Sequence, residues 1–357
     1  MTRTELFELL NTITPPDEDM RAAAHEHWAS RAKPLGGLGE LENIIEDAAA
    51  LTGSIMPDIG LRTLFVLCAD NGIVSHGVTQ TDSSVTRAVA ENLVLNRTSA
   101  CCMARTADCR VVPVDMGIKG GTVEGTLNRR MGDGTADFTL GPAMSEEQLL
   151  NAIQAGILLV REEKARRTGL ICTGEMGIGN TTTSSAVASV LLSESVEKMT
   201  GRGAGLSDEG LKRKCEVIRR GIEVNRPDKN DVLDTLAKLG GFDIAGMCGL
   251  FLGGAIECVP VIADGFISTV AALCAVKLCP MASKAIFASH LSGEGAAAIV
   301  LNALGKKPMI NASMRLGEGT GAVASLPLWD MAMSVYRDCY SFTDGGIEQY
   351  TPQESRP

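Results

Sequence analysis

The chain has 357 residues, of which 45% are hydrophobic and 21% charged, enough for a buried core in one large domain, alone or with a small one. A net charge of −10 argues against a nucleic-acid partner, because binding to a phosphate backbone needs a basic surface. No apolar run reaches the roughly 20 residues of a membrane span, and the first residues lack the apolar centre of a secretory leader.

The eleven cysteines and four histidines form no recognisable metal or disulfide framework. The cysteines lie mostly in apolar runs, where a thiol packs as a small hydrophobic group, and no C-x-x-C pair occurs. We therefore expect a cytoplasmic protein that holds no metal.

Short apolar runs rich in β-branched residues recur along the chain, and each is followed by a glycine- or aspartate-bearing loop and a helical stretch. Because the runs lack polar alternation, both faces of each strand should be covered. The pattern predicts an α/β fold with a doubly wound, mostly parallel sheet of about six strands and helices on both faces. The predicted strands are 63–72, 109–117, 169–177, 258–266, 284–295 and 307–319.

Both ends of the chain are predicted to be helical. The first 30 residues have an amphipathic pattern, and a second helix is expected over 328–340, before a polar end. We expect residues 28–326 to form the large α/β domain. Residues 1–27 and 327–357 would then pack together as a small helical domain.

Each predicted strand ends in a polar or acidic residue. Turns favour such residues on their own account, so any single one carries little weight. As a set they would meet at one edge of a parallel sheet, where ligands bind beyond the carboxyl ends of the strands. The sequence therefore favours one polar pocket formed from Asp70, Asp115, Glu175, Asp264, Ser289, His290 and Glu318.

The loop "TGEMGIGNTTTSSA" (173–186) has the features of a phosphate site. Gly177 and Gly179 bare the backbone, Asn180 and Thr181 stand where a helix N-cap belongs, and Thr182 adds a hydroxyl. The free amides of a helix N-terminus bind anions. The G-x-x-x-x-G-K-[ST] pattern is missing, so a monophosphate fits better than a triphosphate with magnesium. The alternative is an ordinary capped turn between strand and helix.

A second glycine loop, "TGRGAGLSDEGLKRK" (200–214), precedes a helix that carries Lys212, Arg213 and Lys214. One lysine directed at a phosphate would supply the positive charge that this acidic protein otherwise lacks. We expect the other two basic side chains to face solvent.

The stretch "LGEGTGA" (316–322) matches G-x-G-x-x-A, so a dinucleotide-dependent oxidoreductase is a competing hypothesis. The acid inside the loop would repel a pyrophosphate, and only 35 residues follow Ala322, too few for the rest of a nucleotide-binding half. Glu318 could instead be a general base, with a pKa raised by its apolar, glycine-lined surroundings. A glutamate that only satisfies amides at the helix entry is the structural alternative.

Taken together, the motifs resemble the nicotinate-nucleotide:dimethylbenzimidazole phosphoribosyltransferase family, which builds the lower ligand of cobamides. The resemblance covers nearly the whole chain, in family order. It implies a parallel α/β domain, a small helical domain from both chain ends, a homodimer, and no metal or cofactor. It also implies transfer of phosphoribose from nicotinate mononucleotide to a ring nitrogen of a benzimidazole, with inversion and release of nicotinate. The matching stretches are 33–42, 70–78, 112–118, 174–186, 201–214, 241–249, 264–273, 289–297 and 316–322.

The resemblance also implies roles for individual residues, with Glu318 as the catalytic base. Phosphate and ribose would be bound by Glu175, Gly177, Gly179, Asn180, Thr181, Thr182, Gly203, Lys214 and Ser292. The acceptor base would lie among Thr79, Gln80, Arg87, Met176, Leu316 and Gly317.

Departures from the family pattern concentrate in the acceptor pocket. Arg87 stands where the family often has glutamine, and Thr79 and Gln80 begin a stretch that is usually small, aromatic and proline. The donor site is left intact, so the acceptor stays open among benzimidazoles, purines and phenols. A paired subunit, either phenol-activating or non-catalytic, is a further alternative to the homodimer.

Overall fold

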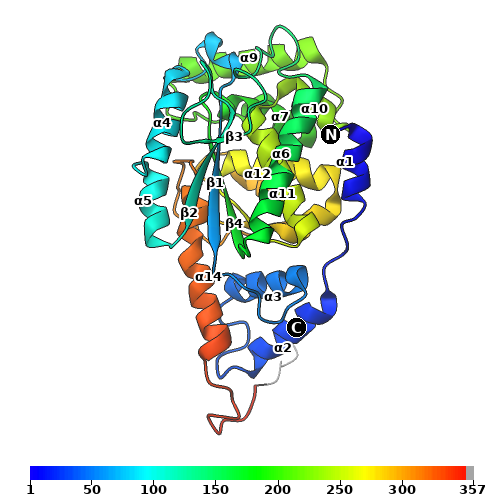
Figure 1. Cartoon of the computed structure of the whole chain (residues 1–357), viewed down its shortest axis with the longest axis vertical. Coiled ribbons are helices and arrows are strands. Elements are labelled where there is room, and N and C mark those ends of the chain that lie inside the picture. Colours follow the sequence, from blue (N-terminus) through cyan, green and yellow to red (C-terminus); the bar gives the residue numbers. More distant parts are fainter. Residues whose placement is uncertain (351–357) are drawn as a thin grey trace.

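The computed structural model describes residues 1–350 and contains one six-stranded sheet in the order β3-β2-β1-β4-β5-β6, with every neighbouring pair parallel. The order reverses between β1 and β4, which makes the sheet doubly wound. Figure 1 shows the sheet edge-on between two helical layers. The strands are β1 (Arg62–Ala69), β2 (Arg110–Gly117), β3 (Leu127–Asn128), β4 (Leu170–Met176), β5 (Val261–Ala263) and β6 (Ile286–Ala288).

Helices cover both faces of the sheet, as the apolar strands require. On one face lie α4 (Ser84–Val94), α5 (Ser99–Thr106) and α14 (Thr320–Asp338); on the other lie α11 (Phe242–Glu257) and α12 (Phe266–Leu278), with α6 (Glu146–Ala165) packed along α11 (Figure 1). The remaining helices are α1 (Arg3–Leu10), α2 (Glu18–Ser30), α3 (Glu40–Thr52), α7 (Asn180–Leu192), α8 (Val196–Met199), α9 (Asp208–Asn225), α10 (Val232–Leu239) and α13 (Ala297–Leu304), with the 3₁₀ turns η1 (Gly72–His76) and η2 (Pro280–Ala285).

Five of the six predicted strands are present, but the prediction for 307–319 is wrong. That segment forms only an isolated bridge, from Ile310 to His290, and its next residues are exposed. Only Met309 packs against the core, so the segment does not bury two faces along its length as a sheet strand does. The sixth strand is β3, at the opposite edge. Two residues are too few to give a periodic signal in the sequence.

Glycines let α6 and α11 approach until their backbones touch. A Cβ at Gly156 would overlap the Gly246 carbonyl oxygen, and a Cβ at Gly249 would overlap the Ile153 carbonyl oxygen. Close helix packing of this kind needs few rings to fill space, which explains a core with many glycines and only 4% aromatic residues.

The chain ends lie in different places. In α1, Arg3 pairs with Glu146 and Asp231, each at 2.8 Å, beside the large domain. By contrast α2, α3 and the far end of α14 lie together below the sheet in Figure 1, where Trp28 meets Tyr336 edge-on at 4.8 Å. The bounds of a small helical domain stay a prediction, and residues 351–357 of it lie outside the described residues. Within residues 1–350, no helix is both long and apolar enough to cross a membrane.

Candidate active site

A cavity of ≈ 190 Å³ opens at the carboxyl ends of β4, β5 and β6, beside the start of α14. The convergence of polar strand ends that the sequence suggests is therefore present for Glu175, Asp264 and His290, and Glu318 joins them from the turn before α14 rather than from a strand end. Asp115 lies elsewhere, buried against Arg130 at 3.0 Å, and Asp70 lines a separate hollow. Predicted site residues that line the cavity are Glu175, Met176, Gly177, Asn180, Thr181, Gly203, Ser292, Leu316, Gly317 and Glu318.

The glycine loop before α7 presents a helix N-terminus to this cavity. The N-cap is Gly179, at φ +94°, rather than Asn180 or Thr181, and no side chain caps the first turn. Gly177 must lack a side chain, because a Cβ there would overlap the Ala69 carbonyl oxygen. The backbone amides of this turn are the feature that an anion needs. Thr182 is fully buried and does not reach the cavity.

Lys214 lies directly behind this loop. Its ammonium donates to Thr181 Oγ1 at 2.8 Å and to the Gly201 carbonyl at 3.1 Å, and its side chain is fully buried. Burial lowers the pKa of Lys214 to about 8. As predicted, Lys212 and Arg213 face solvent. The lysine lies beneath the start of α7, with Thr181 and Gly203 between it and the cavity.

One side-chain amide joins two buried carboxyls, of which Glu175 lines the cavity and Asp243 does not. Asn180 Nδ2 donates both to Glu175 Oε2 and, at 2.9 Å, to Asp243 Oδ2. Burial raises the pKa of Glu175 to about 8 and that of Asp243 to about 6, and each of the two is further raised by a nearby carboxylate. From the sequence alone Asp243 is no more than an acid near the start of a helix, because nothing in the chain order shows that it meets Glu175.

Glu318 sits in a strained turn. Its φ is +60°, between Gly317 and Gly319, both at +85°. A left-handed residue with a side chain is costly by about 1 kcal/mol, and such residues cluster at functional sites. Close packing fixes the turn, since a Cβ on Gly174 would lie 2.7 Å from the Glu318 carbonyl oxygen. The Glu318 carboxylate is half-buried and accepts a long hydrogen bond, 3.4 Å, from the Ala100 amide at the start of α5. Glu175, on the same cavity, is more deeply buried than Glu318.

The start of α14 is closed to a dinucleotide by an internal carboxylate. Asp264 accepts hydrogen bonds from the amides of Gly319 (3.2 Å), Gly321 (2.6 Å) and Ala322 (3.1 Å). A pyrophosphate would need these same amides. The fingerprint-like motif also follows the bridge segment after β6, not β1, where a dinucleotide-binding domain carries it. The oxidoreductase hypothesis therefore loses its main support.

Asp264→Asn should destabilise the protein by about 1–3 kcal/mol at neutral pH. The side-chain NH₂ of asparagine would replace one carboxylate oxygen, so at least one backbone N–H at the start of α14 would lose its acceptor. Chemical unfolding of the purified protein measures this effect. Asp338→Asn, at the exposed far end of the same helix, is the matched control and should change stability little. Equal stabilities of the two variants would contradict a capping role for Asp264.

The predicted acceptor residues divide into two groups. Met176, Leu316 and Gly317 line the cavity, with the exposed Leu316 at its rim. Thr79, Gln80 and Arg87 do not line it. Gln80 donates to the Gly205 carbonyl, and Arg87 donates to the carbonyls of Lys119 (3.1 Å) and Gly121 (2.6 Å), so both support loops. Apolar lining that the sequence did not single out comes from Ile178, Phe266 and Ile267.

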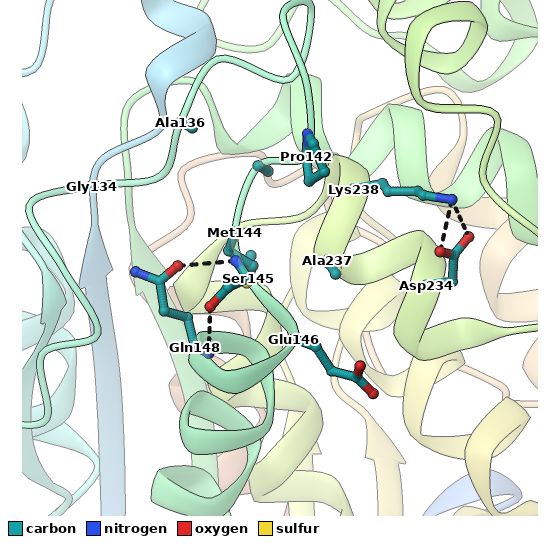
Figure 2. Close-up of a pocket in the computed structure, with 11 residues that line it drawn as sticks. Gly134, Ala136, Pro142, Met144, Ser145, Glu146, Gln148, Asp234, Ala237 and Lys238 are labelled. Atoms are coloured by element: carbon teal, nitrogen blue, oxygen red, sulfur yellow. Dashed lines mark hydrogen bonds and ion pairs between the residues drawn. The ribbon is translucent and has the colours of Figure 1, made fainter. Parts of the chain in front are cut away.

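A larger hollow, ≈ 530 Å³, lies at the start of α6 beside α10 (Figure 2). Its polar groups already satisfy one another. Ser145 and Gln148 form a capping box, and Lys238 pairs with Asp234 at 2.7 Å. It therefore offers a ligand fewer free polar groups than the cavity at Glu318. In the described part of the chain, no group of three or more His, Cys, Asp or Glu side chains is arranged to hold a metal ion.

Comparison with known proteins identifies the family of this chain. A family model described as phosphoribosyltransferase matches residues 13–347. The nicotinate-nucleotide--dimethylbenzimidazole phosphoribosyltransferases of Acetivibrio thermocellus and Ruminiclostridium cellulolyticum are 43% and 40% identical to this chain; the alignments cover 98% and 97% of it and 99% of each relative. The crystal structure of CobT from Thermus thermophilus has a TM-score of 0.88 and 34% identity, covering 93% of this chain and all of that one. The chain therefore belongs to the phosphoribosyltransferase family that these proteins represent.

Proposed function

We propose that the protein transfers 5-phosphoribose from nicotinate mononucleotide to a nitrogen of a benzimidazole-type base, giving an α-ribazole phosphate and nicotinate. The observation that carries the proposal is the pairing of two features in one cavity. An uncapped helix start with a lysine beneath it suits a phosphate, and Glu318 faces the same cavity from a strained turn. The names of the relatives supply the substrates.

Glu318 acts as the general base in this proposal. The acceptor's ring nitrogen becomes a nucleophile when its N–H proton leaves, and a half-exposed carboxylate at the cavity edge can take that proton. The nucleophile then attacks the anomeric carbon as the bond to the pyridinium ring breaks. Nicotinate leaves as a neutral pyridine nitrogen with its own electron pair, so no acid is needed at that atom.

The nucleotide is held by the other side of the cavity. The amides of Gly177 and Gly179 and the positive end of α7 would receive the phosphate, with Lys214 behind them. Ser292 and Glu175 would face the ribose. Met176, Phe266 and Leu316 offer the apolar walls against which a flat base can lie.

The chemistry calls for no metal or cofactor, because the positively charged pyridinium ring of the donor becomes neutral when its bond to the ribose breaks. The homodimer implied by the resemblance belongs to the proposal, with a hetero-pair as the variant of it. Light scattering on the purified protein measures the subunit number directly.

Incubating the purified protein with nicotinate mononucleotide and a panel of azoles, purines and phenols tests the activity. We expect nicotinate release that depends on an azole, and an equimolar base–ribose phosphate detected by mass. Omission of the base is the control. Nicotinate release that ignores the base would indicate hydrolysis, and no release with any acceptor would contradict the proposal.

A further inference from the structure

Lys214 is a buried cation without an ion pair among residues 1–350. Its ammonium has three hydrogens, and the two hydrogen bonds described above use neutral oxygens. A buried ammonium without a counter-charge is costly, and burial lowers its pKa accordingly. The nearest opposing charge comes from Glu294, which lies in the loop before α13 and lines the same cavity.

The Glu294 carboxylate lies on the glycine loop that covers Lys214. A Cβ on Gly201 would overlap Glu294 Oε2, so the carboxylate rests against the Gly201 backbone, whose carbonyl accepts from Lys214. Glu294 also meets the Gly203 amide. Lys214 is assigned to the nucleotide phosphate under the proposed function, and the family resemblance implies that Gly203 binds the phosphate or ribose. A carboxylate of the protein therefore stands where the ligand's negative charge should go.

We propose that the Glu294 carboxylate occupies the phosphate site of the free protein as a resident anion. An incoming phosphate must either displace this carboxylate or bind beside its protonated form. This inference rests on the assignment of Lys214 to the phosphate under the proposed function. Two anions a few ångströms apart in a half-buried site repel each other strongly. Every phosphate ligand therefore loses affinity by a similar factor.

The consequence differs between ligands. Nicotinate mononucleotide gains binding free energy from contacts of its ribose and ring as well as its phosphate, so it still binds despite the repulsion. Inorganic phosphate has no other contacts to offset the repulsion, and the resident carboxylate excludes it. Glu294 would thus keep the site free for nucleotides without contacting the reacting atoms.

The charges around Glu294 set the sign of its pH response. Burial raises the pKa of Glu294, while Lys214, Arg315 and the Gly203 amide oppose that rise. The negative charge of a bound anion favours the protonated form of the Glu294 carboxyl and the charged form of Lys214. Anion binding should therefore be accompanied by proton uptake. The other titratable groups that line the cavity are Glu175, Asp264, His290 and Glu318.

Sulfate is a suitable probe, because it stays a dianion near neutral pH. Its affinity is measured by calorimetry for the unmodified protein, for Glu294→Gln and for Glu91→Gln. Glu91 is exposed on α4, so the control matches the change in net charge at a distance. We expect Glu294→Gln to bind sulfate about tenfold more tightly and Glu91→Gln to bind it unchanged. Unchanged or weaker binding by Glu294→Gln would overturn the proposal.

A second measurement needs no variant. Sulfate titrations of the unmodified protein in buffers of different ionisation enthalpy should show net proton uptake, and none or release would contradict the proposal. These binding tests are independent of turnover. Failure of the transferase assay with tighter sulfate binding would overturn the proposed reaction alone, whereas normal turnover with unchanged sulfate binding would overturn the role of Glu294 alone.

Discussion

Replacing Glu318 by glutamine is expected to lower kcat by about two to four orders of magnitude while nucleotide binding stays nearly unchanged. Glutamine keeps the size of the side chain but cannot accept the acceptor's proton. The Glu318 carboxylate lines the cavity from the turn before α14, whereas the protein groups proposed to bind the phosphate belong to the loop before α7. The contacts of those groups with the nucleotide should therefore survive the substitution. Steady-state kinetics with nicotinate mononucleotide and the best azole measure both quantities.

Comparing turnover with stability separates a base from a merely structural acid. Glu318→Gln should lose turnover while its free energy of unfolding stays close to that of the unmodified enzyme. Glu124→Gln, in an exposed turn, is the control for the charge change. Turnover of Glu318→Gln near that of the unmodified enzyme would remove Glu318 from the mechanism. A fall in thermal stability matching the fall in kcat would indicate a structural role.

Local patterns predicted those features that depend on neighbours in the chain. Apolar runs gave five strands, because a parallel strand must be apolar whatever lies beside it. The glycines at 177 and 179 predicted a bare backbone turn, and the turn is present, uncapped, at the start of α7. The wrong strand at 307–319 shows the limit, since the segment forms only an isolated bridge and the residues directly after Ile310 are exposed.

Contacts between distant segments were not predictable in this way. Asp243 meets Glu175 through Asn180 although 68 positions separate the two acids, and Asp264 caps a helix that begins after Gly319. Glu294 reaches the Gly201 loop from a different strand end. The resemblance to a family supplied residue roles, but it could not show that Arg87 turns to the carbonyls of Lys119 and Gly121.

The buried lysine connects stability with function. Its pKa is lowered to about 8 in the folded protein, from an ordinary value of 10.5. Between these two values the folded protein binds fewer protons than the unfolded chain, so stability rises with pH there. Below pH 8 the folded protein carries the full cost of a buried charge. The group that attracts the phosphate is therefore one that lowers the stability of the protein when no ligand is bound.

Replacing Lys214 by methionine should raise the free energy of unfolding by about 2 kcal/mol at neutral pH, and this gain should shrink as pH rises from 8 toward 10.5. The same change should weaken binding of nicotinate mononucleotide by about a hundredfold, because the attraction between the ammonium and the phosphate is lost. For the unmodified enzyme, the KM for the nucleotide should rise above pH 8 as Lys214 loses its proton, whereas the variant's KM should not follow this titration.

Lys212→Met is the matched control for both effects, since Lys212 lies two residues earlier on the same helix and faces solvent. It changes the net charge equally but should leave stability and KM within experimental error. Chemical unfolding at several pH values and steady-state kinetics provide the two measurements. If Lys214→Met bound the nucleotide as tightly as Lys212→Met does, the phosphate would lie elsewhere. If it were less stable at every pH, the hydrogen bonds to Thr181 and Gly201 would outweigh the cost of the buried charge.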